Sequence, residues 1–254
     1  LEQLKSNKTT SENYSSFSSL QSIDPDAWAS IIFTSGSTGS PKAVVHSLAN
    51  HFYSALGANQ LMPLNPGDRW LISLPLYHVG GLAIFFRTLL SGATMVVPSE
   101  KLTLAETLTN KKISHLSLVP TQLQRLLQSS AGIDSLLQLK LILLGGSPIP
   151  EILLDQSEEL GLNINTTYGS TEMASQVATG KKDNHRILPF REVRISSEKD
   201  ACPEIEVRGK TRFLGYLYES GLSQPFDKNG WFKTGDIGAL DVNPTKSKNF
   251  QPEN

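Results

Sequence analysis

The sequence contains a single cysteine, Cys202, so no disulfide can form within the chain. One thiol fits a reducing compartment, and a loop position before Pro203 is its simplest interpretation. Apolar runs are also short, since none approaches the roughly 20 residues that a helix needs to cross a bilayer. The first residues lack the charged-then-apolar pattern of a signal peptide. We therefore expect a cytoplasmic protein without a transmembrane segment, which meets membranes only peripherally if at all.

The chain also lacks an excess of basic residues. Its formal net charge is -1, from 23 Lys and Arg against 24 Asp and Glu. Because nucleic-acid-binding surfaces usually leave a basic excess, we expect no nucleic acid partner. With 39% hydrophobic and 19% charged residues among 254, the composition is typical of a globular protein with one large domain or two small ones. Composition leaves open whether the chain is a monomer or a homo-oligomer.

The residue pattern changes along the chain. Residues 1–25 are rich in Ser, Asn, Lys and Thr and predict a linker or exposed extension. Residues 26–189 alternate apolar runs with helical segments, which predicts an α/β subdomain with a mainly parallel sheet and flanking helices. Residues 190–241 alternate polar and apolar positions, which predicts a smaller β-rich subdomain. Residues 242–254 are expected to be a tail or the remnant of a hinge region.

Individual elements can be assigned within these parts. The expected strands are 31–34, 43–46, 70–74, 94–97, 115–119, 139–144, 163–167, 191–195 and 204–208. The expected helices are 47–60, with Ser47 as N-cap, 81–90, 103–110, 121–129 and 150–160. Because ligands of parallel sheets bind beyond the carboxyl ends of the strands, the polar loops after strands are the candidate sites.

The first such loop follows the predicted strand 31–34 and ends in a lysine. It supplies hydroxyls, flexible backbone and one cation, from Thr34, Ser35, Gly36, Ser37, Thr38, Gly39 and Lys42. These groups can enclose a polyphosphate, because glycines let the backbone approach and backbone amides attract anions. The spacing differs from that of a Walker A loop. A flexible polar turn is an equally good interpretation of the Ser/Gly run alone.

Candidates for binding an acid surround the predicted helix 81–90. His78 stands near Gly81 after a strand and can line a cleft, although a lone histidine is more often a packed residue. Arg87 lies inside the nearly apolar run 82–90. A buried guanidinium needs an anionic partner, and a substrate carboxylate suits its two-pronged geometry. The alternative is that the Arg87 head reaches solvent along its apolar stem.

Each of three later segments has both a ligand-binding and a purely structural interpretation. Gly145, Gly146 and Ser147 follow a buried strand, where bare backbone can receive a flat ring or simply turn the chain. Thr171 and Glu172, after Tyr168, Gly169 and Ser170, place a hydroxyl beside a carboxylate. That pair can bind a phosphate oxygen and Mg²⁺, or only start a helix. The tripeptide Thr-Gly-Asp that ends at Asp236 indicates by itself only a turn.

Taken in order, these segments resemble the adenylate-forming family, which includes acyl- and aryl-CoA ligases. The resemblance rests above all on Thr-Ser-Gly-Ser-Thr-Gly-x-Pro-Lys at 34–42 and Tyr-Gly-x-Thr-Glu at 168–172. It implies an ATP/AMP site in which residues 34–39 hold phosphates, residues 145–147 and 168–169 surround adenine, and Asp236 binds the ribose. It also implies that Glu172 ligates Mg²⁺, that Lys42, Thr171, Glu172 and His78 serve catalysis, and that His78, Gly81, Arg87 and Ser170 line the acid pocket.

The segments 74–87, 117–127 and 168–176 look most like the 2-succinylbenzoate–CoA ligases of menaquinone biosynthesis, a branch of this family. The reaction implied has two steps: a carboxylate attacks ATP to form an acyl-adenylate, and coenzyme A then displaces AMP. The hinge motif and late lysine of the family are not found after Asp236, so we expect slow turnover by this chain alone. Another acid substrate, or a nucleotide-binding core without full activity, remains an alternative.

Overall fold

The computed structural model describes residues 24–34, 41–182, 184–196, 203–241 and 249–252. Most of its strands belong to one mixed sheet of 11 strands, in the order β10-β11-β14-β15-β9-β8-β7-β6-β5-β3-β4. A separate sheet of 4 strands has the order β1-β2-β12-β13. Within the described ranges, none of the helices combines the length and apolar character that a membrane crossing requires.

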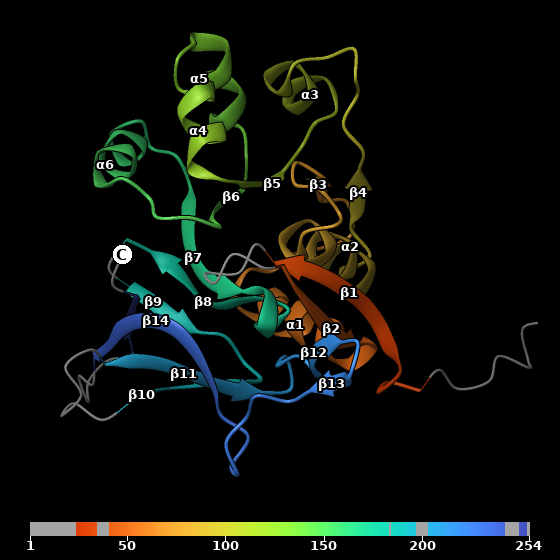
Figure 1. The fold of residues 1–254 in the computed structure, drawn as a ribbon. Coiled ribbons are helices and arrows are strands. Elements are labelled where there is room, and N and C mark those ends of the chain that lie inside the picture. Colours follow the sequence, from red (N-terminus) through yellow and green to blue (C-terminus); the bar gives the residue numbers. More distant parts are fainter. Residues whose placement is uncertain (1–23, 35–40, 183, 197–202, 242–248, 253–254) are drawn as a thin grey trace, which may run out of the picture.

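The parallel half of the large sheet has helices on both faces (Figure 1). Its strands are β3 (Arg69–Leu71), β4 (Thr94–Val96), β5 (His115–Leu118), β6 (Leu141–Gly145) and β7 (Ile164–Ser170). On one face pack α3 (Leu104–Asn110), α4 (Pro120–Leu126), α5 (Ser130–Leu137) and α6 (Glu151–Glu159). On the other face lie α1 (Leu48–Leu61) and α2 (Val79–Ser91).

Alternation along the strands builds these two cores. On β6, Ile142 and Leu144 pack with the α3–α6 face, whereas Leu141 and Leu143 pack with α1 and α2. Successive side chains of a strand point to opposite faces, so an unbroken apolar run indicates burial on both. The prediction of an α/β fold with a mainly parallel sheet is confirmed for this half.

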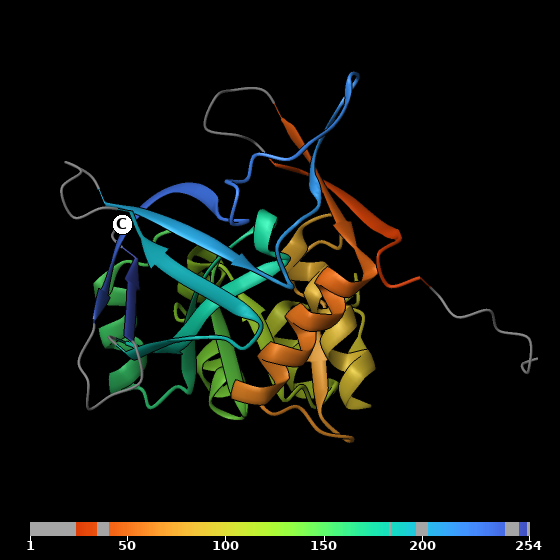
Figure 2. The ribbon, with the colours of Figure 1, turned by 90° about the horizontal axis from the view of Figure 1, so that it is seen from below.

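The other half of the large sheet is antiparallel. It consists of β8 (Ser175–Lys181), β9 (Asn184–Ile187), β10 (Arg191–Ile195), β11 (Glu204–Gly209), β14 (Phe232–Asp241) and β15 (Asn249–Pro252). The smaller sheet contains β1 (Trp28–Thr34), β2 (Lys42–Ser47), β12 (Gly215–Tyr218) and β13 (Gly221–Ser223). Figure 2 shows β12 and β13 beside β1 and β2, although most of the chain separates them. The subdomain boundary at residue 190 stays a prediction.

One local prediction needs correction, and one element was not predicted. The helix expected over 121–129 ends at Leu126, and Ser129 instead caps α5 by accepting a hydrogen bond from the Gly132 backbone N–H at 3.1 Å. The hairpin of β8 and β9 was not predicted, because the Lys-Lys-Asp-Asn connection lacks a typical turn glycine. By contrast, Ser47 caps α1 as expected, accepting from the Asn50 N–H at 3.2 Å.

Candidate functional site

The expected phosphate loop is described only at its two ends. Thr34 ends β1 and Lys42 begins β2, and these two residues pair across the small sheet. The predicted phosphate-binding residues Ser35, Gly36, Ser37, Thr38 and Gly39 lie outside the described residues. The antiparallel β1–β2 pair therefore fixes where the loop begins and where it ends.

Lys42, Tyr216 and Glu172 come together from three distant segments. The Lys42 Nζ lies 5.1 Å from the centre of the Tyr216 ring, an ammonium–aromatic contact. The Tyr216 hydroxyl donates to Glu172 Oε1 at 2.8 Å. Burial and then the Glu172 charge raise the pKa of Tyr216, so the phenol stays protonated and donates. Sequence reasoning identified Lys42 and Glu172 but missed Tyr216, which reaches them only because β12 pairs with β2.

Glu172 belongs to the 3₁₀ turn η3 (Thr171–Met173), which directly follows β7. Its donor chemistry fits Mg²⁺ accompanied by nucleotide phosphates, since a carboxylate beside a threonine hydroxyl offers only hard oxygen ligands. Within the described part, no three His, Cys, Asp or Glu side chains gather to form a complete metal cage. Glu172 would therefore share the ion with phosphate oxygens and water.

Tyr168 and Asp236 form a second contact between predicted site residues. The Tyr168 hydroxyl donates to Asp236 Oδ2 at 2.7 Å, linking β7 to β14. Burial, followed by this hydrogen bond, raises the pKa of Tyr168. Glycine is required next to Tyr168, because a Cβ on Gly169 would lie 2.1 Å from the Ser175 carbonyl oxygen. Ser170 follows with a buried hydroxyl that has no hydrogen-bond partner within the described residues.

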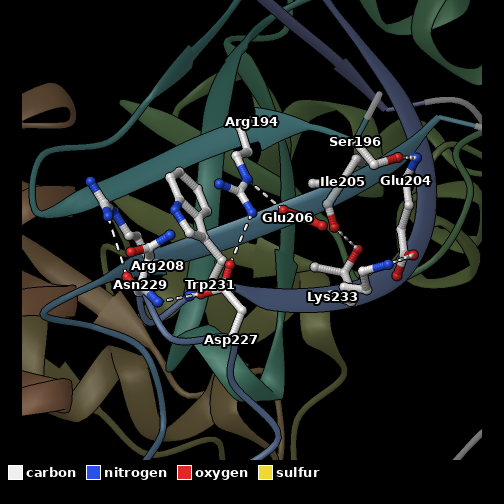
Figure 3. Close-up of polar contacts among 11 residues, drawn as sticks. Arg194, Ser196, Glu204, Ile205, Glu206, Arg208, Asp227, Asn229, Trp231 and Lys233 are labelled. Atoms are coloured by element: carbon white, nitrogen blue, oxygen red, sulfur yellow. Dashed lines mark hydrogen bonds and ion pairs between the residues drawn. The ribbon is translucent and has the colours of Figure 1, made fainter. Parts of the chain in front are cut away.

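A network of polar contacts holds the segment before Asp236 (Figure 3). The Trp231 ring lies between the guanidinium groups of Arg194 and Arg208, at 4.3 and 4.5 Å from the ring centre. Further along, the Thr234 hydroxyl donates to the Ile205 carbonyl at 2.8 Å. The Gly235 N–H donates to Glu204 Oε1, also at 2.8 Å. These contacts fix the backbone of β14 just before the exposed Asp236 carboxylate.

The predicted adenine segment at 145–147 lies at the end of β6. Gly145 is required by packing, because a Cβ there would lie 2.5 Å from the Thr167 Cγ2 atom. Gly146 has a φ of +86°, a left-handed conformation that favours glycine. Ser147 is exposed beside it. The glycines thus have a structural role, which leaves a nucleotide-binding role as a prediction.

Three of the predicted acid-binding residues lie on α2 or just before it, whereas Ser170 lies at the end of β7. His78 is the exposed N-cap residue of α2, with its ring 4.7 Å from that of Tyr77. Gly81 lets the helix approach the preceding loop, since a Cβ there would lie 2.1 Å from the Pro75 carbonyl oxygen.

Arg87 is 1% exposed, so the interpretation that its head reaches solvent is wrong. Its guanidinium donates to the Gln176 side-chain oxygen and lies 5.4 Å from the Trp70 ring centre. Among the described residues Arg87 forms no ion pair, and its Nε has no acceptor. Burial lowers the pKa of Arg87 to about 10, so the side chain is still a cation at neutral pH.

Two buried histidines behind η3 were not predicted as site residues. His46 Nε2 lies 2.7 Å from the Thr171 carbonyl oxygen, and His46 Nδ1 lies 3.3 Å from Ser30 Oγ. Ser30 Oγ also lies 2.7 Å from His51 Nε2. Burial lowers the pKa of His46 to about 4 and that of His51 to about 3, with the His46 charge contributing to the latter. Both rings are neutral at pH 7, and no motif in the sequence marks them.

Comparison with known proteins agrees with this arrangement. The sequence profile of the AMP-binding enzyme family matches residues 1–217. The 2-succinylbenzoate–CoA ligase of Salmonella typhimurium is 42% identical over 220 residues, which are 85% of this chain and 46% of that protein. The chain spans about half the length of the curated relatives it matches.

Two solved structures of o-succinylbenzoate CoA synthetase (MenE) from Bacillus subtilis have the same fold. One, in complex with the acyl-adenylate intermediate OSB-AMP, has a TM-score of 0.76 at 30% identity and covers 90% of this chain and 49% of its own. The other, in complex with ATP and magnesium ion, has a TM-score of 0.74 at 30% identity and covers 86% and 49%. With the family profile matching most of its length, the chain belongs to the AMP-binding enzyme family.

Proposed function

We propose that this chain is the nucleotide- and acid-binding core of an AMP-forming acid–thiol ligase of menaquinone biosynthesis. Its acid would be 2-succinylbenzoate, its cosubstrates ATP and coenzyme A, and its ion Mg²⁺. The observation that carries the proposal is the convergence of Lys42, Tyr216 and Glu172 beside the end of the 34–42 loop. A cation and a carboxylate in one small volume suit a magnesium-bound polyphosphate.

The chain's contribution to adenylation would be positioning and charge neutralisation. Lys42 and the loop 34–39 would hold phosphate oxygens, while Thr171 would contact the α-phosphate. Glu172 would hold Mg²⁺, which supplies positive charge against the phosphates. Asp236 would accept from the ribose hydroxyls, while Gly145, Gly146, Ser147, Tyr168 and Gly169 would surround adenine.

For the acid, Arg87 is the proposed carboxylate anchor. A cation buried without a carboxylate partner in the described protein stabilises an incoming anion more than a solvated cation can. His78, Gly81 and Ser170 would line the remainder of the acid pocket. 2-Succinylbenzoate carries two carboxylates, so one can bind Arg87 while the other attacks ATP.

A pyrophosphate-release assay with 2-succinylbenzoate, ATP and Mg²⁺ tests this proposal. We would measure this chain and a form extended at both ends to the length of its relatives. Release by both supports an active ligase core, whereas release only by the extended form makes this chain a binding core. Absence of release from either would refute the ligase proposal.

The metal assignment has its own test. Glu172→Gln keeps the shape of the side chain and removes its charge, so Mg²⁺-dependent adenylation should fall by at least about tenfold. The matched control is Glu159→Gln, the same substitution on the exposed end of α6, which should have the original rate. An unchanged rate in Glu172→Gln would refute the metal assignment.

We also propose a cytoplasmic location, where ATP and coenzyme A are available. Cell fractionation with an antibody against the chain would test it. The oligomeric state is a separate question, which size-exclusion chromatography with light scattering would answer.

A further inference from the structure

The turn that carries Thr171 and Glu172 has an unfavourable backbone. Ala174 has a φ of 52° and Ser175 a φ of 112°, two successive non-glycine residues with positive φ. Such conformations cost free energy and persist only where surrounding contacts determine them. The turn therefore needs anchors outside its own sequence.

Three carbonyl groups of this turn are held by three different segments of the chain. The Thr171 carbonyl accepts from His46 on β2 at 2.7 Å, and the Ala174 carbonyl accepts from Ser54 on α1 at 2.6 Å. The Glu172 carbonyl accepts from the Phe213 N–H at 2.7 Å. Of these three, the His46 contact lies at the residue proposed to touch the α-phosphate.

The hydrogen bonds around His46 have a single consistent direction. The Thr171 carbonyl can only accept, so His46 Nε2 carries the proton. In a neutral ring His46 Nδ1 then accepts, and the Ser30 hydroxyl donates to it. Ser30 Oγ in turn accepts from His51 Nε2–H. These protons and tautomers follow from the hydrogen-bond partners.

The network ends against the helix of the proposed acid site. The His51 ring stacks on Phe86, with centroids 4.8 Å apart and planes 8° apart, and Phe86 precedes Arg87 on α2. His46 and His51 are 0% and 2% exposed. A packed ring at one end and an anchored carbonyl at the other leave the imidazole of His46 little freedom to rotate.

We infer that His46, held by Ser30 and His51, is a positioning residue that sets the Thr171 carbonyl and thereby the phosphate-facing side of the Thr171–Glu172 turn. This inference rests on the proposed function. It assigns no chemical step to His46, whose ring contacts the turn from behind.

Two amide substitutions at His46 separate positioning from packing. In His46→Gln the side-chain nitrogen can reach the place of Nε2 and still donate to the Thr171 carbonyl. In His46→Asn the shorter side chain can replace only Nδ1, so the bond to Thr171 is lost while that to Ser30 is kept. Both changes remove the buried ring and differ from each other by one methylene, so a role in packing alone predicts similar MgATP affinities for them.

The experiment measures KM for MgATP and for 2-succinylbenzoate in the extended form, and Kd for MgATP by calorimetry in this chain. His46→Asn should raise KM and Kd for MgATP about tenfold, the scale of one lost buried hydrogen bond. His46→Gln should stay within about twofold of the original protein. The KM for the acid should change less than that for MgATP in either variant.

A control and a second variant complete the test. His115→Asn removes a histidine that is 3% exposed, is bonded to Ser114 and takes no part in the hydrogen bonds of His46, Ser30 and His51, so it should leave MgATP affinity unchanged. Ser30→Ala keeps His46 and removes the bridging hydroxyl, and should weaken MgATP binding about threefold. If His46→Asn fails to fold, the MgATP affinity of Ser30→Ala decides whether the inference holds.

Equal MgATP affinities in His46→Asn and His46→Gln, or an unchanged affinity in Ser30→Ala, would overturn the inference alone. If the unsubstituted protein neither binds MgATP nor releases pyrophosphate, the proposed function fails first and the inference fails with it.

Discussion

Two neighbouring arginines, Arg87 and Arg191, are both buried but are bonded very differently. Arg191 donates to the carbonyls of Gln176, Pro189 and Ser54, and also to the Ser54 hydroxyl. Arg87 donates to the Gln176 side chain, and its Nε has no acceptor among the described residues. Both guanidiniums thus donate to Gln176, but only that of Arg191 has its hydrogen-bonding capacity filled by the protein.

This difference separates a structural cation from one that can receive a ligand. Arg191 ties α1, β8 and β10 together through backbone oxygens, and burial with the Arg87 charge lowers its pKa to about 9. Arg87 contributes less to the fold than its burial suggests. Bringing an anion to it would complete its hydrogen bonds and offset the repulsion between the two cations.

The largest expected effect is that of Arg191→Met. It removes a buried donor set and leaves several carbonyls without partners, so the free energy of unfolding should fall by roughly 3 kcal/mol or more. Urea denaturation followed by circular dichroism measures it. A loss below about 1 kcal/mol would show that water replaces the guanidinium and would remove the contrast with Arg87.

Arg87→Met is the same substitution at the other arginine of the comparison. The substitution removes a desolvated charge at nearly constant volume, so stability should stay within about 1 kcal/mol or increase. The KM for 2-succinylbenzoate should nevertheless rise by at least about tenfold, because the proposed carboxylate anchor is gone. An unchanged KM would favour a different acid, and a large loss of stability would make Arg87 structural like Arg191.

Lowering the pH tests whether His46 and His51 are buried as neutral rings. His46 and His51 have folded pKa values of about 4 and about 3, below the ordinary value of 6.5. The unfolded chain therefore binds more protons below pH 6.5, and stability should fall as the pH drops from 6.5 toward 4. The slope is about 1.4 kcal/mol per pH unit for each histidine.

The free energy of unfolding would be measured at about pH 7.5, 6 and 5. His51→Gln removes one of the two titrating histidines, so it should reduce the slope by about 1.4 kcal/mol per pH unit. An identical slope in that variant would contradict the assignment of His51 as a buried neutral ring.

The smallest expected effect belongs to Arg208, an arginine at the surface. It pairs with Glu192 at 2.7 Å and lies against Trp231, and its side chain is 36% exposed. Arg208→Ala should lower the free energy of unfolding only slightly, and by far less than Arg191→Met. Thermal melting in low and high salt checks this, and a loss as large as that of Arg191→Met would mean that burial does not govern these arginines.

The sequence predicted elements and motifs that depend on local chemistry. Ser47 caps α1 because a serine followed three residues later by asparagine satisfies the helix start locally. The strand at 191–195 was evident from its alternating pattern. Ser129 was misassigned because a capping serine can follow one helix as readily as it starts the next.

The contacts that build the site could not be predicted from the sequence. Tyr216 and His46 belong to no motif, and their partners Glu172 and Thr171 are far away in the sequence. Such contacts follow from the pairing of distant strands, which local periodicity does not encode. The hydrogen bond from Arg87 to Gln176 could not be predicted for the same reason, since Gln176 lies on β8.

The pairing of β2 with β12 also has a consequence for folding. Val44 on β2 pairs with Tyr216 on β12, so the chain must close a very long loop before Lys42 can meet the Tyr216 ring. Non-local pairings of this kind form slowly, whereas the local α/β units can form early. During synthesis from the N-terminus, β2 would wait unpaired on that side until β12 leaves the ribosome. The phosphate-facing corner should therefore be among the last parts of this chain to assemble.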